Sequence, residues 1–131
     1  MIEARRGLIL FAHGARDARW AQPFERLREL VVARVTGVPV ALAYLELMQP
    51  DLAAAAHDLV RRGCVALTIV PVFLGEGGHV RRDLPERVAA LRSRYPQVAI
   101  DCTAAAGEDH AVLAALADYC VGSLIDNSVN S

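Results

Sequence analysis

The sequence predicts an α/β domain of three layers, in which a four-stranded parallel sheet in strand order 2-1-3-4 lies between helices. Short apolar runs alternate four times with segments whose apolar residues recur at helical spacing. Strands that alternate with helices form parallel sheets with helices packed on their faces. The apolar runs are continuous, which is typical of strands that are buried on both faces. We therefore expect a fold of the flavodoxin-like group.

Length and composition limit the possible functions. The 131 residues suit one domain, predicted over 1–125, with a polar tail at 126–131 that we expect to fray. A hydrophobic content of 54% supports a full core, and a net charge of −1 argues against nucleic-acid binding. No apolar stretch approaches the roughly 20 residues needed to cross a bilayer. We expect a cytoplasmic protein with no nucleic-acid or membrane partner.

The first half of the chain contains two predicted strand–helix units. The first strand is residues 7–12 (GLILFA) and the second is residues 38–45 (VPVALAYL). Gly37 ends the helix between them. Pro50 opens the next helix, where a missing N–H costs nothing, and Gly63 closes it. The first helix is predicted from apolar residues at helical spacing: Trp20, Phe24, Leu27, Val31 and Val35.

The second half repeats this alternation. The third strand is predicted over residues 65–73, and the fourth over 98–103. A helix is expected to start near Leu84, because Asp83 and Glu86 have the spacing of a capping box. The last helix is predicted to have an apolar face made of Val112, Leu113, Leu116, Cys120 and Leu124.

The three cysteines, Cys64, Cys102 and Cys120, are predicted to be buried packing residues. Their number is odd and no C-x-x-C pair occurs, which argues against disulfides and thiolate zinc sites.

Two histidines and a glutamate are the candidate site residues. In an open parallel sheet, ligands bind beyond the carboxyl ends of the strands, where the strand order reverses. For order 2-1-3-4 this point lies between strands 1 and 3. His13 follows strand 1, His79 lies in the loop after strand 3, and Glu46 follows strand 2. Imidazole and carboxylate groups suit a divalent first-row metal, although a histidine at a strand end is often structural.

Other residues at this edge are candidates for holding an anionic substrate. Gly77 and Gly78 allow the backbone to approach a ligand closely. Arg16, Arg81 and Arg82 could pair with carboxylates, although solvated charges explain them equally well. The chain contains no lysine, so it has no G-x-x-x-x-G-K-[ST] phosphate loop, and no G-x-G-x-x-G follows the first strand.

Three sequence blocks resemble the small sirohydrochlorin cobaltochelatases and ferrochelatases, which are class II chelatases. LILFAHGARDARWAQPFERL resembles the opening block, in which H-G-S-R-D and a helix with P-F follow an apolar strand. YLELMQPDLAAAAHDLVRRG resembles the second block, and VPVFLGEGGHVRRDLPE resembles the third, where a glycine-bearing loop carries the second histidine. The blocks cover most of residues 7–87 in the expected order. Ala15 stands where the family commonly has serine.

The resemblance implies a lyase that inserts a divalent metal into sirohydrochlorin without ATP, in cobalamin- or sirohaem-type tetrapyrrole biosynthesis. It implies that His13 and His79 are the metal-binding and catalytic histidines and that Glu46 matches a conserved acidic position. Co²⁺ is the expected metal substrate, with Fe²⁺ or Ni²⁺ as alternatives, and no organic cofactor is expected. Longer relatives contain two such domains, so we expect a homodimer that completes the cleft.

Two other functions fit the same residues. A metal carrier without catalytic activity, or a degenerate chelatase-fold protein, would keep metal binding and lose turnover. A flavodoxin-like module for a phosphate-bearing ligand would bind through backbone N–H groups at a helix start and would not need two histidines.

Overall fold

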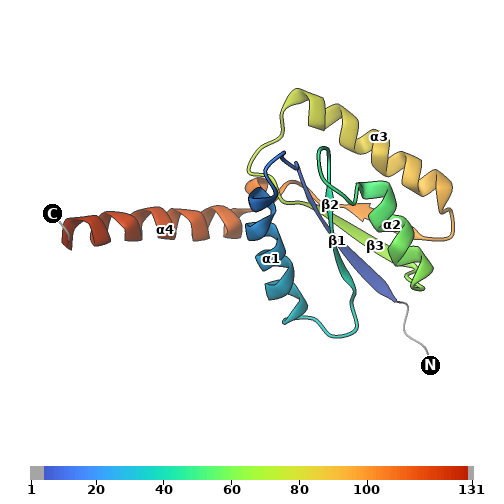
Figure 1. Ribbon diagram of the computed structural model, residues 1–131, viewed down its shortest axis with the longest axis horizontal. Coiled ribbons are helices and arrows are strands. Elements are labelled where there is room, and N and C mark those ends of the chain that lie inside the picture. The colour runs from blue at the N-terminus through green and yellow to red at the C-terminus, as the bar shows by residue number, and fades with distance from the viewer. Residues whose placement is uncertain (1–4, 130–131) are drawn as a thin grey trace.

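The computed structural model describes the chain from residue 5 to residue 129, and its side chains as far as residue 124. Four parallel strands form one sheet in the order β2-β1-β3-β4, as predicted (Figure 1). Both the parallel direction and the strand order are therefore confirmed. The strands are β1 (Arg6–Ala12), β2 (Val40–Tyr44), β3 (Ala66–Pro71) and β4 (Ala99–Cys102).

Four α-helices and two short 3₁₀ helices connect and follow these strands. Helices α2 and α3 cover one face of the sheet, α1 lies against the other face, and α4 projects away from the body of the domain (Figure 1). Within residues 5–129, no helix combines the length and the apolar content needed to cross a membrane. The helices are η1 (Ala18–Ala21), α1 (Gln22–Val32), α2 (Leu52–Arg61), α3 (Gly78–Arg94), η2 (Ala106–Glu108) and α4 (His110–Val129).

The larger core lies between the sheet and the pair α2 and α3. Alternate residues of the central strands point into it, since successive side chains of a strand face opposite sides of the sheet. Ile9, Phe11 and Ile69 are completely buried there. The helices contribute leucines and a valine at helical spacing: Leu52 and Leu59 from α2, and Leu84, Val88 and Leu91 from α3.

The opposite face of the sheet is covered only in part. A small cluster of Ala12, Ala21 and Tyr44 packs beneath η1 and α1 at the β1–β2 side. On the β3–β4 side of this face, Thr68 and Asp101 are exposed, and they are register partners on adjacent strands. In the described part of the chain, no helix packs over this half of the face (Figure 1).

Helix α3 begins earlier than the sequence predicts. Its N-cap is Gly77, so the expected start near Leu84 is wrong by more than one turn. Val80 is buried one turn before Leu84 and extends the apolar stripe of the helix toward its start. Asp83 does not cap the helix: its carboxylate accepts a hydrogen bond from Arg87 Nε at 2.6 Å, one turn later. Pro85 lies inside the helix.

Two other helix ends also differ from expectation. Helix α1 ends at Val32 and not at Gly37, and α4 continues to Val129. Residues 126–129 are therefore helical where the sequence predicts a frayed tail, and residues 130–131 lie outside the described part of the chain.

The cysteines differ in burial. Cys64 is buried as predicted, Cys102 is half-buried, and Cys120 is exposed on α4, so the prediction for Cys120 is wrong. The apolar pattern around Cys120 predicts that its helix is covered, but no described element of the same chain covers it.

Replacing Ile69 by alanine tests the core. Ile69 is completely buried in the central strand β3, so we expect the Ile69→Ala variant to lose about 3–4 kcal/mol of unfolding free energy. Urea denaturation followed by circular dichroism measures this loss. Leu74→Ala is the control, because that side chain is 68% exposed and should change stability by less than about 0.5 kcal/mol. Equal effects of the two substitutions would contradict the described packing.

Candidate active site

His13 and Glu46 lie in adjoining segments at the carboxyl edge of the sheet. Leu45 N donates to Ala12 O at 2.9 Å, and Glu46 N donates to His13 O at 3.1 Å. The pairing of β1 with β2 therefore continues past the ends of both strands. His13 is half-buried and Glu46 is exposed. His13 and Glu46, which the sequence places at the same edge of the sheet, are thus joined by a backbone hydrogen bond.

A glycine makes this close pairing possible. Gly14 has a φ of +93°, and a Cβ atom on it would lie only 1.9 Å from the carbonyl oxygen of Glu46. A side chain at position 14 would therefore separate the two segments, and the positive φ would strain any residue other than glycine. Gly14 fixes the approach of the Glu46 segment to His13.

The imidazole of His13 stacks on an aromatic ring from the next strand. The ring centroids of His13 and Phe73 are 4.1 Å apart, and the ring planes are inclined by 27°. Phe73 is buried and follows β3, whose neighbour in the sheet is β1. This contact holds the His13 ring at the point where the strand order reverses. The sequence reasoning missed Phe73; its one signal was an aromatic residue at the end of the third apolar run.

His79 lies at the other end of the connection that begins with Phe73. It occupies the first turn of α3, directly after Gly77 and Gly78, and it is exposed. The loop that the sequence predicts around His79 is therefore the beginning of a helix. Within residues 5–129, no group of three or more His, Cys, Asp and Glu side chains is arranged to hold a metal ion. His13, His79 and Glu46 do not form a ready three-ligand centre in the single chain.

The segment before α4 packs against the same connection. Gly107 N donates to Phe73 O at 2.8 Å. A Cβ on Gly107 would lie 1.7 Å from the carbonyl oxygen of Leu74. The chain segments that follow β3 and β4 are therefore locked together beside His13.

The predicted substrate-binding arginines have different environments. Arg81 lines a cavity of about 320 Å³ together with Glu76, Arg92 and Cys102. Burial, and then the nearby Glu76 carboxylate, raise the pKa of the Cys102 thiol, which keeps this thiol neutral near pH 7. Arg82 Nε donates to Gly78 O at 3.3 Å, within the first turns of α3.

Arg16 is exposed and forms no ion pair with the described residues. Its neighbour Arg19 is already engaged, because its guanidinium lies 2.8 Å from the Asp17 carboxylate. The hydrogen bonds from Arg19 hold the pKa of Asp17 below its usual value. Of these two arginines, Arg16 is therefore the one without an ion-pair partner in the described part of the chain.

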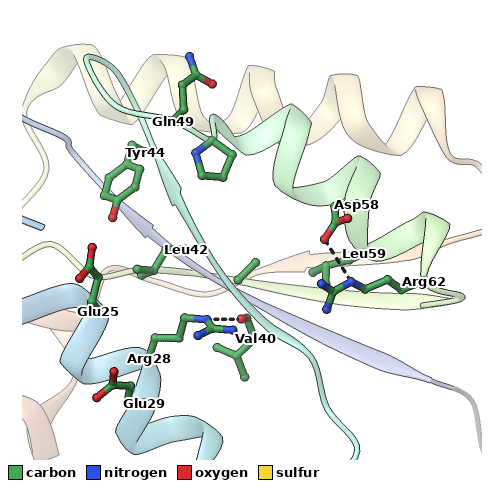
Figure 2. Close-up of a pocket in the computed structure, with 12 residues that line it drawn as sticks. Glu25, Arg28, Glu29, Val40, Leu42, Tyr44, Gln49, Asp58, Leu59 and Arg62 are labelled. Carbon is green, nitrogen blue, oxygen red and sulfur yellow. Dashed lines mark hydrogen bonds and ion pairs between the residues drawn. The ribbon is translucent and has the colours of Figure 1, made fainter. Parts of the chain in front are cut away.

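A cavity that the sequence did not predict lies along the edge strand β2 (Figure 2). It has a volume of about 510 Å³ and lies between α1, β2 and α2. Two of its arginines already have partners, since Arg28 Nε donates to Val40 O and Arg62 lies 3.3 Å from the Asp58 carboxylate. Burial, and then the charge of Glu25, raise the pKa of Tyr44. Neither His13 nor His79 lines this cavity.

The sheet topology and the placement of His13 define a doubly wound α/β domain whose candidate site lies at the switch point of the sheet. The sequence profile of the CbiX family matches residues 7–120. The chain belongs to the CbiX family.

Individual relatives agree with this assignment. The sirohydrochlorin ferrochelatase of Bacillus subtilis is 28% identical over 113 residues, which are 86% of this chain and 43% of that protein. The sirohydrochlorin cobaltochelatase of Methanopyrus kandleri is 30% identical over 79 residues, which are 60% of this chain and 55% of that protein. The chain thus spans about half the length of these two relatives.

A solved structure matches over nearly its whole length. The putative cobalamin biosynthesis CbiX protein of Marinobacter aquaeolei VT8 has a TM-score of 0.82 and 32% identity, with coverage of 92% of this chain and 98% of that chain. The aligned region covers so much of this chain that it reaches into α4.

Substitution of Gly14 tests how tightly the site is built. Gly14 and Gly37 both have positive φ, but only Gly14 has an atom of another segment within 4 Å of its Cβ position, apart from its chain neighbours. We expect Gly37→Ala to cost about 1 kcal/mol of unfolding free energy through backbone strain. Gly14→Ala should cost at least about 2 kcal/mol more, because the Glu46 segment must move. Chemical denaturation measures both values. Equal losses of unfolding free energy in the two variants would show that the Glu46 segment moves away from residue 14 at no cost.

Proposed function

We propose that this chain inserts a divalent metal into sirohydrochlorin without ATP, and that His13 and His79 carry the metal. The observation that carries the proposal is the stacking of His13 on Phe73 at 4.1 Å, at the end of the connection that leads to His79. A stacked, half-buried imidazole keeps a fixed direction at the sheet edge, where ligands of such folds bind. Membership in the CbiX family and the names of its relatives support the same activity.

Cobalt is the metal substrate that we propose first. The Methanopyrus relative is a cobaltochelatase, and the Marinobacter protein is named for cobalamin biosynthesis. The Bacillus relative is a ferrochelatase, so iron is the main alternative. Cobalt, iron and nickel all accept imidazole ligands, and ligand type alone does not separate them.

The two histidines have different roles in this proposal. Insertion requires the metal to lose water and two pyrrole nitrogens to lose protons. His79 is exposed on the first turn of α3, where it can receive the hydrated metal. His13 is oriented by Phe73 and holds the metal toward the macrocycle, and an imidazole released from the metal accepts a pyrrole proton near neutral pH. Glu46, beside His13, orients an imidazole or accepts the second proton.

Cationic groups at the same edge bind the carboxylates of the tetrapyrrole. Gly77 and Gly78 begin α3, and the free N–H groups of a helix start attract anions. We assign Arg16, Arg81 and Arg82 to the rim, because guanidinium groups pair with carboxylates in a planar, two-bonded geometry. The proposed reaction exchanges a metal ion for two pyrrole protons and requires no organic cofactor.

We further propose that two copies of the chain form a homodimer. The described residues contain no group of three or more possible metal ligands, so in this proposal the metal keeps coordination positions open for other ligands. The macrocycle, water and a facing copy are the sources of the remaining ligands, and a facing copy would also close the cleft.

Substitution of each histidine tests the activity. We expect His13→Ala and His79→Ala to lower the rate of cobalt insertion into sirohydrochlorin by about 100-fold or more. The measurement is the change in the absorption spectrum of the tetrapyrrole, repeated with iron and nickel. His57→Ala is the control: His57 is exposed on α2, where its Nδ1 lies 2.9 Å from the Tyr95 hydroxyl, and its loss should leave the rate nearly unchanged.

Full activity in both site variants would end the assignment. Metal binding by the unaltered chain without any turnover would identify a carrier instead of an enzyme.

Neutralising Arg81 tests the binding of substrate carboxylates. We expect Arg81→Gln to raise KM for sirohydrochlorin several-fold and to change kcat little, because the lost charge acts on binding before and during reaction alike. Adding salt should weaken the difference between the variant and the unaltered protein. Arg34→Gln is the matched control, since Arg34 is exposed just beyond the end of α1. An unchanged KM in Arg81→Gln would show that Arg81 does not bind the carboxylates of the substrate.

A further inference from the structure

Strand β2 forms one edge of the sheet, so half of its backbone groups have no neighbouring strand to bond. Leu45 N donates to Ala12 O on the side of β1. Because the backbone groups of successive strand residues point to opposite sides, the alternate residues Val40, Leu42 and Tyr44 turn their N–H and C=O groups away from β1. These outward groups face the cavity between α1, β2 and α2 (Figure 2).

The chain closes this edge itself on both sides of Leu42. Arg28, on α1, donates from Nε to Val40 O at 2.6 Å. At the other end of the strand, Tyr44 N donates to Pro50 O at 2.9 Å. The N–H and C=O of Leu42 lie between these two closures and border the cavity of about 510 Å³. They are the part of the edge that remains open to a ligand.

The hydroxyl of Tyr44 is directed into the same cavity. The residue is only 4% exposed, and Figure 2 shows its hydroxyl pointing toward Glu25, with no hydrogen bond from any other residue that lines the cavity. Burial, and then the charge of Glu25, raise the pKa of Tyr44, so its phenol stays neutral near pH 7. A buried hydroxyl normally has a hydrogen-bond partner, and here the cavity is where a ligand can supply one.

The charges that line the cavity favour a cation. Glu25 and Glu29 lie one turn apart on α1, and neither forms an ion pair in the described part of the chain. The third carboxylate, Asp58, lies 3.3 Å from the Arg62 guanidinium. The only other lining cation, Arg28, is already bonded to the strand. Both arginines are thus engaged, while two carboxylates are left without a counter-ion.

We propose that this cavity binds a small guanidinium compound, whose planar head lies between Leu42 O, the Glu25 carboxylate and the Tyr44 hydroxyl. Arg28 shows the same chemistry one step along the strand, since its guanidinium takes the preceding outward carbonyl of β2. A guanidinium has five N–H donors in one plane and stays charged near neutral pH. It can therefore bond to several acceptors of this site at once.

Other kinds of ligand fit these groups less well. A bare metal ion would need a ligand set that the described residues do not form. An ammonium group is more strongly hydrated than a guanidinium, so it loses more on entering the cavity. An added peptide strand would need the outward groups of Val40 and Tyr44, and Arg28 and Pro50 already bond to these. A compact ligand that contacts Leu42 alone avoids this competition.

The cavity is separate from the site proposed for metal insertion, because neither His13 nor His79 lines it. The inference therefore goes beyond the proposed function and does not depend on it. The hydrogen bond from Tyr44 N to Pro50 O closes the loop that carries Glu46. A ligand held by Tyr44 thus lies at the base of that loop.

Calorimetric titration of the full-length protein with butylguanidinium tests the proposal. We expect saturable binding with a Kd of about 1 mM or lower. Butylammonium, the matched probe with a different head, should bind at least about ten-fold more weakly. Glu25→Gln should raise Kd for butylguanidinium about ten-fold or more, because it removes a charged acceptor, and Tyr44→Phe should raise it several-fold. Glu86→Gln is the control, since Glu86 is exposed on α3, and it should leave Kd unchanged.

Nuclear magnetic resonance locates the ligand. The amide signals of Leu42, Tyr44 and Gln49 should shift as butylguanidinium is added, and the signals of α3 and α4 should not. A lack of saturable binding, equal affinity for the two probes, an unchanged Kd in Glu25→Gln, or shifts confined to other parts of the protein would each overturn the proposal. A blocked tripeptide with arginine at its centre should bind no more tightly than butylguanidinium. If the tripeptide bound at least about ten-fold more tightly, the ligand would be a protein segment and not a small compound.

Discussion

Hydrogen bonding of β1 to a strand on each side determines where everything else in this domain lies. Its pairing with β2 and with β3 holds the ends of three strands at one edge. The chain leaves β1 toward α1 on one face of the sheet and leaves β3 toward α3 on the other face, so these two connections separate at the carboxyl edge beside His13. Gly14 and Phe73 then fix the position of that histidine from two sides, through a backbone contact and through ring stacking. The candidate site is therefore a product of the sheet topology.

The strand order, the parallel direction and the placement of His13 and Glu46 could be predicted from local apolar runs, because buried parallel strands leave a continuous pattern in the sequence. The start of α3 could not, since the burial of Val80 depends on packing against distant strands and overrides the signal of Asp83, Pro85 and Glu86. Phe73 was missed for the same reason: stacking joins residues that are 60 positions apart. The apolar residues of α4 predicted a buried helix face, but the structure leaves Leu113, Leu116, Cys120 and Leu124 exposed, because a local pattern does not say what covers a helix.

The two faces of the sheet differ in how much apolar surface they bury, and this difference affects the stability of the domain. The side of α2 and α3 is a closed core within one chain. On the other side, several large apolar side chains of α4 and α1 face water, including Leu30 and Leu116. Each such side chain would gain about 1.5–3 kcal/mol on full burial. If a second chain supplies that cover, the stability of the domain rises with protein concentration, and folding and pairing become one process.

Pro85 gives the first turn of α3 a mechanical property of its own. A proline has no N–H, so the carbonyl of Arg81 lacks the hydrogen bond that would tie the opening turn to the next one. Helices bend most easily at such an interruption. His79 therefore lies in a helix turn that can bend relative to the rest of α3. His13, by contrast, is held by a backbone hydrogen bond to Glu46 and by stacking on Phe73. Under the proposed function, one fixed and one movable imidazole would let the metal change its ligands during transfer.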